Sequence, residues 1–215
     1  MKVTKFPTTI VDLVQPAVVG LAMRLYVLTE GRQGKAKAKP NVLTFYETGI
    51  VHALYETMLM SPALDSWQIR VEEKQHGKWV DLWLRHVKGG DPVRIEAGDL
   101  FRGKPDKANS DAQKLKNLHQ GSKARSSWFL ALVRDLRAEI DENRKKNDSL
   151  GAKKRRFPLD PRRVLIARIK KSMNRKGGLD PQLVDFDERL VRVFSIYRPG
   201  AKADVFGTIL FKVKT

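Results

Sequence analysis

Apolar residues recur with helical spacing in two segments near the N-terminus. Residues 8–29 are mainly apolar, and Thr8 or Thr9 can supply the side-chain oxygen that caps the first turn of a helix. In residues 41–60, apolar side chains recur every three or four positions after Asn41, another residue suited to capping. The pattern therefore predicts two long helices with a polar connection between them.

A different periodicity follows the second helix. Apolar and polar residues alternate over residues 66–74, 78–86 and 92–101, as they do in strands that turn one face toward a core. Residues 106–120 are mainly polar and are expected to form a helix, whereas the apolar run 126–133 is typical of a strand buried on both faces. From the second helix onward, the predicted order is helix, three strands, helix and strand.

The remainder of the chain begins with a strongly basic stretch. Residues 135–180 hold 15 basic and 7 acidic residues, which indicates a boundary or an arm. Within this stretch, residues 160–169 could form a helix that begins at an Asp-Pro pair, although residues 164–169 could equally form a strand. Residues 189–197 and 205–213 alternate well enough to predict two further strands.

These elements predict an α+β (α/β) fold whose αβββαβ core contains a mixed central sheet. We divide the chain into an N-terminal helix and basic loop (residues 1–40), the core (41–134), and a basic arm with a C-terminal β-containing extension (135–215). A chain of 215 residues is long enough to bury a sizeable core without disulfides or structural metals.

The net charge narrows the choice of partner. The chain carries 42 Lys and Arg residues against 24 Asp and Glu, a formal net charge of +18. Such a surplus of positive charge attracts polyanions, and binding to a phosphate backbone is favoured because it releases the condensed counterions. The alternative is a ribosome-like or merely basic surface. No strongly amphipathic helix accompanies the basic runs, and charged residues and a proline interrupt the apolar N-terminal segment, so no membrane partner is expected. The chain has no cysteine, which fits a cytoplasmic protein.

Three groups of basic residues are the candidates for contact with a phosphate backbone. The first lies in the polar connection near the N-terminus, which could equally be a solvated linker, and the other two lie in the basic arm. The candidates are Lys35, Lys37, Lys39, Arg144, Lys145, Lys146, Lys153, Lys154, Arg155 and Arg156.

Two acidic residues on neighbouring predicted strands are the candidates for chemistry. In an antiparallel pair joined by a loop of even length, the numbers of opposed residues add to an odd constant. A two-residue turn at residues 88–89 would place Asp81 opposite Glu96, and a turn at residues 89–90 would place them diagonally on the same face. A loop of odd length would send one carboxylate to the other face.

Opposed carboxylates repel each other, so another group should offset the repulsion. Arg85 or Arg94 could do so in part, and Asp81 would then be an ordinary charge on an edge strand. A divalent cation would do so more completely, because Mg²⁺ prefers one or two carboxylate oxygens and leaves its other positions to water and substrate phosphate. This pair therefore predicts a site for Mg²⁺ or Mn²⁺.

Residues 41–134 resemble the core of the PD-(D/E)XK restriction-endonuclease-like superfamily. The resemblance is carried by the predicted helix with Glu47, the strand with Asp81, the strand Arg94-Ile95-Glu96-Ala97-Gly98, the following helix and the buried strand. It implies that Asp81 and Glu96 are the metal-binding acids of the site. It also implies that Glu47 is the helix glutamate that many members add to the metal site, although a glutamate on a helix surface is most often only solvated.

The sequence departs from the family pattern at two positions. Val80 stands where the motif has proline, and Gly98 occupies the position of the lysine that orients the attacking water. In some members this lysine comes from elsewhere in the core, and the nearby candidates here are Lys104, Lys114 and Arg85.

The resemblance and the charge together predict a metal-dependent endonuclease that hydrolyses phosphodiester bonds, with DNA favoured over RNA as the substrate. The alternative is a non-catalytic nucleic-acid-binding subunit with a degenerate nuclease fold, which the glycine in the lysine position favours. A scaffold that uses only its basic arm is a third possibility. A homodimer and a subunit of a larger nucleoprotein assembly both remain compatible with the sequence.

Overall fold

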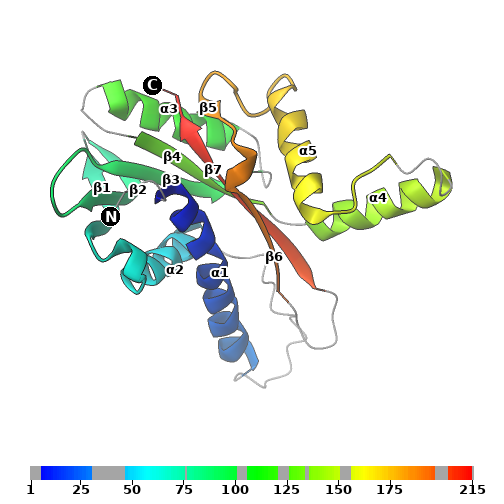
Figure 1. Ribbon diagram of the computed structural model, residues 1–215, viewed down its shortest axis with the longest axis horizontal. Coiled ribbons are helices and arrows are strands. Elements are labelled where there is room, and N and C mark those ends of the chain that lie inside the picture. The colour runs from blue at the N-terminus through cyan, green and yellow to red at the C-terminus, as the bar shows by residue number, and fades with distance from the viewer. Residues whose placement is uncertain are drawn as a thin grey trace.

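The structure is a computed structural model that describes residues 6–30, 47–75, 77–100, 106–120, 126–133, 136–150, 156–196 and 203–214. Within these residues the chain forms five α-helices and one seven-stranded mixed sheet (Figure 1). The expectation of an α+β fold with a mixed central sheet is therefore confirmed.

One continuous sheet contains strands from both the predicted core and the C-terminal part of the chain. Its strands are β1 (Trp67–Gln75), β2 (Lys78–His86), β3 (Val93–Asp99), β4 (Ser126–Val133), β5 (Val184–Asp185), β6 (Val191–Ile196) and β7 (Asp204–Val213). The order is β1-β2-β3-β4-β7-β5, and β6 also pairs with β7. Only the β3–β4 pair is parallel among these pairings. Because β7 pairs with β4, the C-terminal residues belong to the same sheet as the core.

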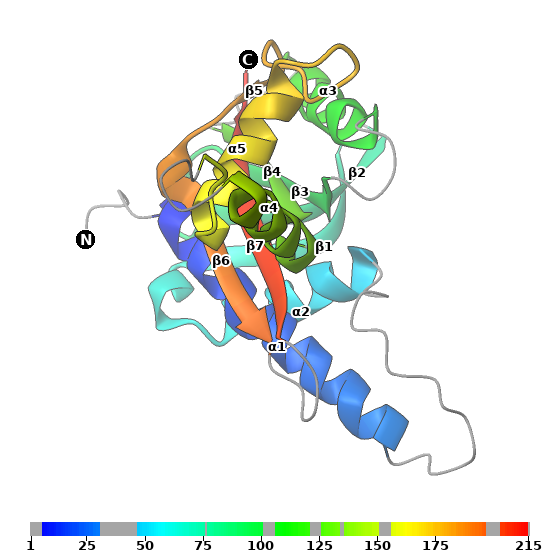
Figure 2. The ribbon, with the colours of Figure 1, turned by 90° about the vertical axis from the view of Figure 1, so that its right-hand side faces the viewer.

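Helices cover both faces of the sheet. One face carries α1 (Phe6–Glu30) and α2 (Glu47–Leu59), and the other carries α3 (Asp106–Gln120), α4 (Leu136–Leu150) and α5 (Pro161–Met173) (Figures 1 and 2). Strand β4 contributes to both interfaces, since alternate apolar residues along it belong to two different hydrophobic clusters. Its continuous apolar sequence thus reflects burial on both sides, as predicted.

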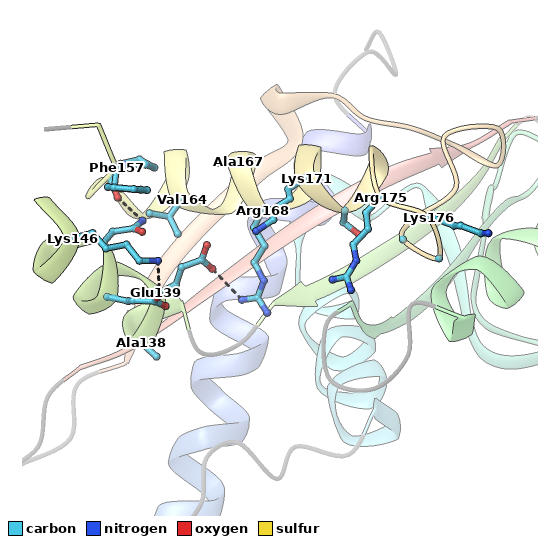
Figure 3. A pocket seen from close by; sticks show the side chains of 16 residues that line it. Ala138, Glu139, Lys146, Phe157, Val164, Ala167, Arg168, Lys171, Arg175 and Lys176 are labelled. Carbon is cyan, nitrogen blue, oxygen red and sulfur yellow. Dashed lines mark hydrogen bonds and ion pairs between the residues drawn. The ribbon is translucent and has the colours of Figure 1, made fainter. Parts of the chain in front are cut away.

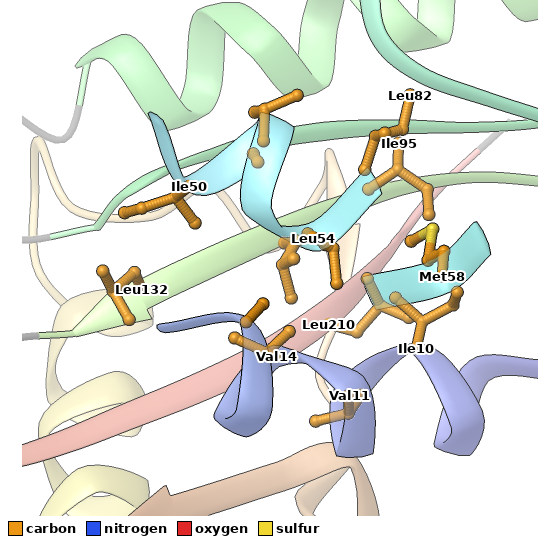
Figure 4. Packing of buried hydrophobic residues seen from close by; sticks show 14 of the residues in the cluster. Ile10, Val11, Val14, Ile50, Leu54, Met58, Leu82, Ile95, Leu132 and Leu210 are labelled. Atoms are coloured by element: carbon orange, nitrogen blue, oxygen red, sulfur yellow. The ribbon is translucent and has the colours of Figure 1, made fainter. Parts of the chain in front are cut away.

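The residues of β2 and β3 that pack against α2 show, by alternation along each strand, which of their neighbours face α3. Leu82 of β2 and Ile95 of β3 are fully buried in the cluster that includes Leu54 and Met58 of α2 (Figure 4). Side chains alternate between the two faces of a strand, so the immediate neighbours of Leu82 and Ile95 point toward α3 instead.

The predicted helices and strands agree with the structure at most positions described. Strands β1 to β4 lie within two residues of their predicted bounds, and β6 and β7 also match. Helix α1 begins at Phe6, so the prediction that Thr8 or Thr9 caps it is wrong. The predicted cap at Asn41 lies outside the described residues. Helix α5 settles the choice between helix and strand at residues 164–169 in favour of the helix.

The sequence analysis missed α4, whose residues it assigned to a boundary or an arm. This helix is largely polar but buries Leu136 and Ile140 in the same cluster as α5. Gly207 of β7 explains how closely these helices approach the sheet, because a Cβ there would meet side-chain atoms of Leu136 and Leu165. The short strand β5 was also missed.

Helix α1 has the length and composition of a membrane-crossing helix over Phe6–Met23, where the mean hydropathy is 1.4. In the fold, a third of that window is buried, including Ile10 and Val14, which pack in the α2 cluster (Figure 4).

Candidate functional site

The register of β2 and β3 places two carboxylates side by side beneath α3. Leu82 pairs with Ile95 and Trp83 with Arg94, and continuing this register by one residue sets Asp81 opposite Glu96. The connection between the strands, residues 87–92, has even length, which keeps both acids on one face. Oδ2 of Asp81 accepts a hydrogen bond of 2.8 Å from the backbone N–H of Ala97, the residue after Glu96. Asp81 is thereby held against β3 at the position of its acidic neighbour.

Glu96 is an acid in an almost fully desolvated position. It is 2 % exposed, and its Oε2 lies 2.6 Å from Nζ of Lys114 on α3. Burial and repulsion from Asp81 raise the pKa of Glu96 to about 8, even though the hydrogen bond from Lys114 acts in the opposite direction. Oε1 of Glu96 is also buried and has no hydrogen-bond partner among the described residues. One lysine therefore does not satisfy this carboxyl group.

Helix α3 brings a third acid to the same place. Asp111 precedes Lys114 by three residues, so the two side chains share one face of the helix. The charge of Asp111 contributes to the raised pKa of Glu96, which places it near the pair. The sequence analysis did not name Asp111 among the candidate residues. The spacing of three and four residues between Asp111, Lys114 and Leu115 was the signal available in the sequence, because it places Asp111 on the helix face that carries the buried Leu115.

Arg94 fixes the other end of α3 against the sheet. Its side chain is 2 % exposed and donates hydrogen bonds to Oε1 of Gln75 on β1 and to the carbonyl oxygen of Leu118 near the end of α3. Burial lowers the pKa of Arg94. Because both α3 and β1 accept hydrogen bonds from it, Arg94 aligns the helix that carries Lys114 with the strands that carry the acids.

The oxygen atoms at this site are of the type that a hard divalent cation prefers as ligands. Asp81 and Glu96 supply carboxylate oxygens from adjacent strands, and the buried Oε1 of Glu96 lacks a partner in the described structure. A proton or a cation can stabilise Glu96 there. Among the residues described, however, no three or more His, Asp or Glu side chains form a ready-made metal cluster. Any Mg²⁺ or Mn²⁺ would therefore depend on water and substrate oxygens for much of its coordination.

Of the three candidates to replace the missing lysine, the structure brings Lys114 to the acids. Arg85 is exposed and donates to the carbonyl oxygen of Gly90, in the β2–β3 connection. Lys104 lies outside the described residues. Gly98 is the second residue after Glu96 on β3, and a Cβ there would come within 3.4 Å of the Phe129 ring, an ordinary contact.

The remaining predicted residues lie elsewhere or cannot be placed. Glu47 is the first residue of α2, but its side chain lies outside the described part, as do Lys35, Lys37, Lys39, Lys153, Lys154 and Arg155. Arg144, Lys145 and Lys146 are exposed on α4; Arg144 pairs with Asp141 and Lys146 with Glu142. Arg156 is exposed, and its backbone N–H donates to Asn147.

The site thus combines two neighbouring acids on the sheet and a third acid on α3 with one lysine that contacts the more buried acid. It can bind a cation through carboxylate oxygens and present a positive charge beside them. No protein-family profile, curated protein or solved structure matches the chain.

Proposed function

We propose that this protein is a metal-dependent endonuclease that hydrolyses phosphodiester bonds in DNA. The observation that carries the proposal is the contact of 2.6 Å between Lys114 and Glu96, next to Asp81 on the adjacent strand. Two acids that can hold a metal ion and a lysine beside them are a set of groups that can assist the hydrolysis of a phosphodiester. Here the lysine comes from α3, which accounts for the glycine at position 98.

Each of the three side chains has a separate task in this proposal. Asp81 and Glu96 would hold Mg²⁺ or Mn²⁺, which when bound polarises a phosphoryl oxygen and lowers the pKa of water. The N–H of Ala97 orients Asp81, so one carboxylate is fixed before any ligand arrives. Lys114 carries a positive charge that can stabilise the negative charge developing on the phosphate in the transition state. The Lys114–Glu96 contact keeps that ammonium group at the site.

Two further features support the proposal. The described elements α2, β1, β2, β3, α3 and β4 follow the αβββαβ order of the nuclease superfamily that residues 41–134 resemble. The net charge of +18 suits a polyanionic substrate. Neither feature depends on the geometry of the acidic pair, so each contributes independently.

Metal binding is the step to test first. Mn²⁺ and Mg²⁺ affinities would be measured by calorimetry on the wild-type protein, on Asp81→Asn and on Glu96→Gln. The matched control is Asp148→Asn, which removes an exposed carboxylate on α4. We expect weakened binding in the two site variants and unchanged binding in the control. Equal affinities in all four proteins would contradict the proposal.

A non-catalytic nucleic-acid-binding module is the second candidate. It is favoured by Gly98 in the lysine position and by the Lys114–Glu96 contact, which brings a positive charge to the site without a metal. Such a module would show no metal affinity that depends on Asp81 or Glu96, yet its binding to DNA would persist and weaken with salt. The same set of variants therefore separates the two functions.

A further inference from the structure

A groove between α4 and α5 carries a surplus of positive charge. It has a volume of about 820 Å³. Helices α4 and α5 lie on the same face of the sheet as α3, and Figure 3 shows the side chains that line the groove between them. Its charged lining consists of five basic and two acidic residues: Lys146, Arg168, Lys171, Arg175, Lys176, Glu139 and Glu142. Four of the five basic residues belong to α5 or to the turn after it, within the basic arm that the sequence analysis expected to contact the substrate.

The two acids are already neutralised by basic neighbours. Arg168 lies 3.6 Å from Glu139, and Lys146 pairs with Glu142. In the part of the chain that the structure describes, Lys171, Arg175 and Lys176 form no ion pair, and all three are exposed. The net charge of the groove therefore resides at the end of α5 and in the turn that follows it.

That turn holds its basic side chains on a defined backbone. Gly177 has a φ of +73°, and a Cβ on Gly178 would collide with the backbone of Ser172, so neither glycine is easily replaced. The N–H of Gly178 donates to the carbonyl oxygen of Arg175 at 2.9 Å. The sequence thus builds a tight turn directly after α5, with Arg175 and Lys176 on it.

The same turn is fastened to the helix of the candidate site. Asn109 of α3 donates from Nδ2 to the carbonyl oxygen of Gly178 at 2.9 Å, and its Oδ1 accepts from the backbone N–H of Asp180 at 2.9 Å. Asn109 lies two residues before Asp111 and five before Lys114 on α3. The basic end of the groove is therefore joined directly to the element that completes the acidic site.

The lining suits a phosphate backbone better than exposed bases. Its one aromatic residue, Phe157, has Nζ of Lys146 at 5.5 Å from the ring centroid, so a cation already occupies one side of the ring. On the α5 side of the groove, Arg168 and Arg175 extend in the same direction (Figure 3). Guanidinium and ammonium groups without carboxylate partners bind phosphate oxygens irrespective of base sequence.

We infer that the α4–α5 groove binds the phosphodiester backbone of the nucleic acid and leads it toward α3. Lys171, Arg175 and Lys176 make the phosphate contacts. This assignment rests on the proposed function only for the identity of the polyanion. The sequence analysis placed phosphate contacts in the same basic arm but at other residues, among which Arg144 and Lys146 pair with acids on α4.

The test is a binding measurement that involves no chemistry. Fluorescence anisotropy of a labelled DNA duplex in EDTA, over a series of salt concentrations, would compare the wild-type protein with Arg175→Ala/Lys176→Ala. The control double variant Lys78→Ala/Lys88→Ala removes the same charge from exposed positions of the β1–β2 and β2–β3 hairpins. We expect the groove variant to weaken binding on the order of tenfold and to reduce the slope of log K against log salt by roughly 2, with little change in the control.

Binding of both double variants to vesicles containing phosphatidylserine would be measured in parallel. Three outcomes would overturn the inference: equal losses of DNA affinity in both double variants, no loss of DNA affinity in the groove variant, or a loss in the groove variant that affects vesicle binding alone. The last result would assign the groove to a membrane surface. Failure of the proposed function looks different, because the wild-type protein would then bind DNA through the groove in EDTA but cut nothing when Mg²⁺ is added. Circular dichroism of both variants confirms that they remain folded.

Discussion

Replacing Glu96 with glutamine should change how stability depends on pH in a defined direction. Burial and Asp81 raise the pKa of Glu96 from an ordinary 4.5 to about 8, so the folded protein holds this proton more tightly than the unfolded chain does. The contribution of protonated Glu96 to the free energy of unfolding is fully present below pH 4.5 and is lost as the pH rises toward about 8. Glutamine is neutral at every pH and should therefore abolish this loss.

The magnitude follows from the gap between the two pKa values. At ~1.4 kcal/mol per pKa unit, the difference between 4.5 and about 8 corresponds to about 5 kcal/mol across that range. The side chain is only 3 % exposed, so solvent screening reduces this figure little. The wild-type protein should thus lose about 5 kcal/mol relative to Glu96→Gln between pH 4.5 and pH 8.5.

Urea denaturation in EDTA, at intervals from pH 4.5 to 9, measures this difference. Comparing the two proteins cancels the effect of the net charge of +18, which both share apart from residue 96. Glu142→Gln is the control: Lys146 lowers the pKa of this exposed acid, so its contribution is already complete above pH 4.5 and stays constant to pH 9. Parallel stability curves for the wild type and Glu96→Gln would refute the account of a desolvated carboxyl group.

Three further predictions follow from the same site and from the packing around it. Because a lysine at position 98 would stand on the face of Glu96, Gly98→Lys should restore DNA cleavage to Lys114→Ala in a cleavage assay; no recovery in a folded double variant would mean that Lys114 is not a displaced motif lysine. Mn²⁺ affinity, measured by calorimetry, should rise about tenfold per pH unit below pH 8, because the cation displaces the proton of Glu96; pH-independent affinity would show that Glu96 is not a ligand. Gly207→Ala should lower the free energy of unfolding by about 1–3 kcal/mol, because its methyl group would overlap Leu165; an unchanged urea midpoint would show that α5 can move aside.

The strands of the core were predictable because their periodicity is simple. Alternation of apolar and polar residues, typical of a strand with one face on the core, predicted β1 to β3, and a continuous apolar run predicted β4. The positions of Asp81 and Glu96 followed from the even length of the β2–β3 connection, without any knowledge of the helices. This part of the candidate site depends only on strand register, which local sequence determines.

Contacts between distant elements could not be predicted in the same way. Lys114 was one of three candidates for the lysine, and only the packing of α3 on the sheet brings it to Glu96. Helix α4 was missed because its apolar residues are few and its basic residues suggested an arm. The sequence placed phosphate contacts in the basic arm, but it could not show that Arg175 lines a groove beside α4, in a turn that Asn109 of α3 holds through Gly178. Such contacts depend on tertiary structure, which periodicity does not describe.

The most direct test of the central claim is a cleavage assay on supercoiled and linear DNA, with Mg²⁺, with Mn²⁺ and with EDTA. The wild-type protein and Asp148→Asn should cut DNA only when a metal is present, and Asp81→Asn and Glu96→Gln should be inactive while still binding DNA in EDTA. Cleavage by purified Glu96→Gln at the wild-type rate, or no cleavage by any of the proteins under any metal condition, would contradict the account.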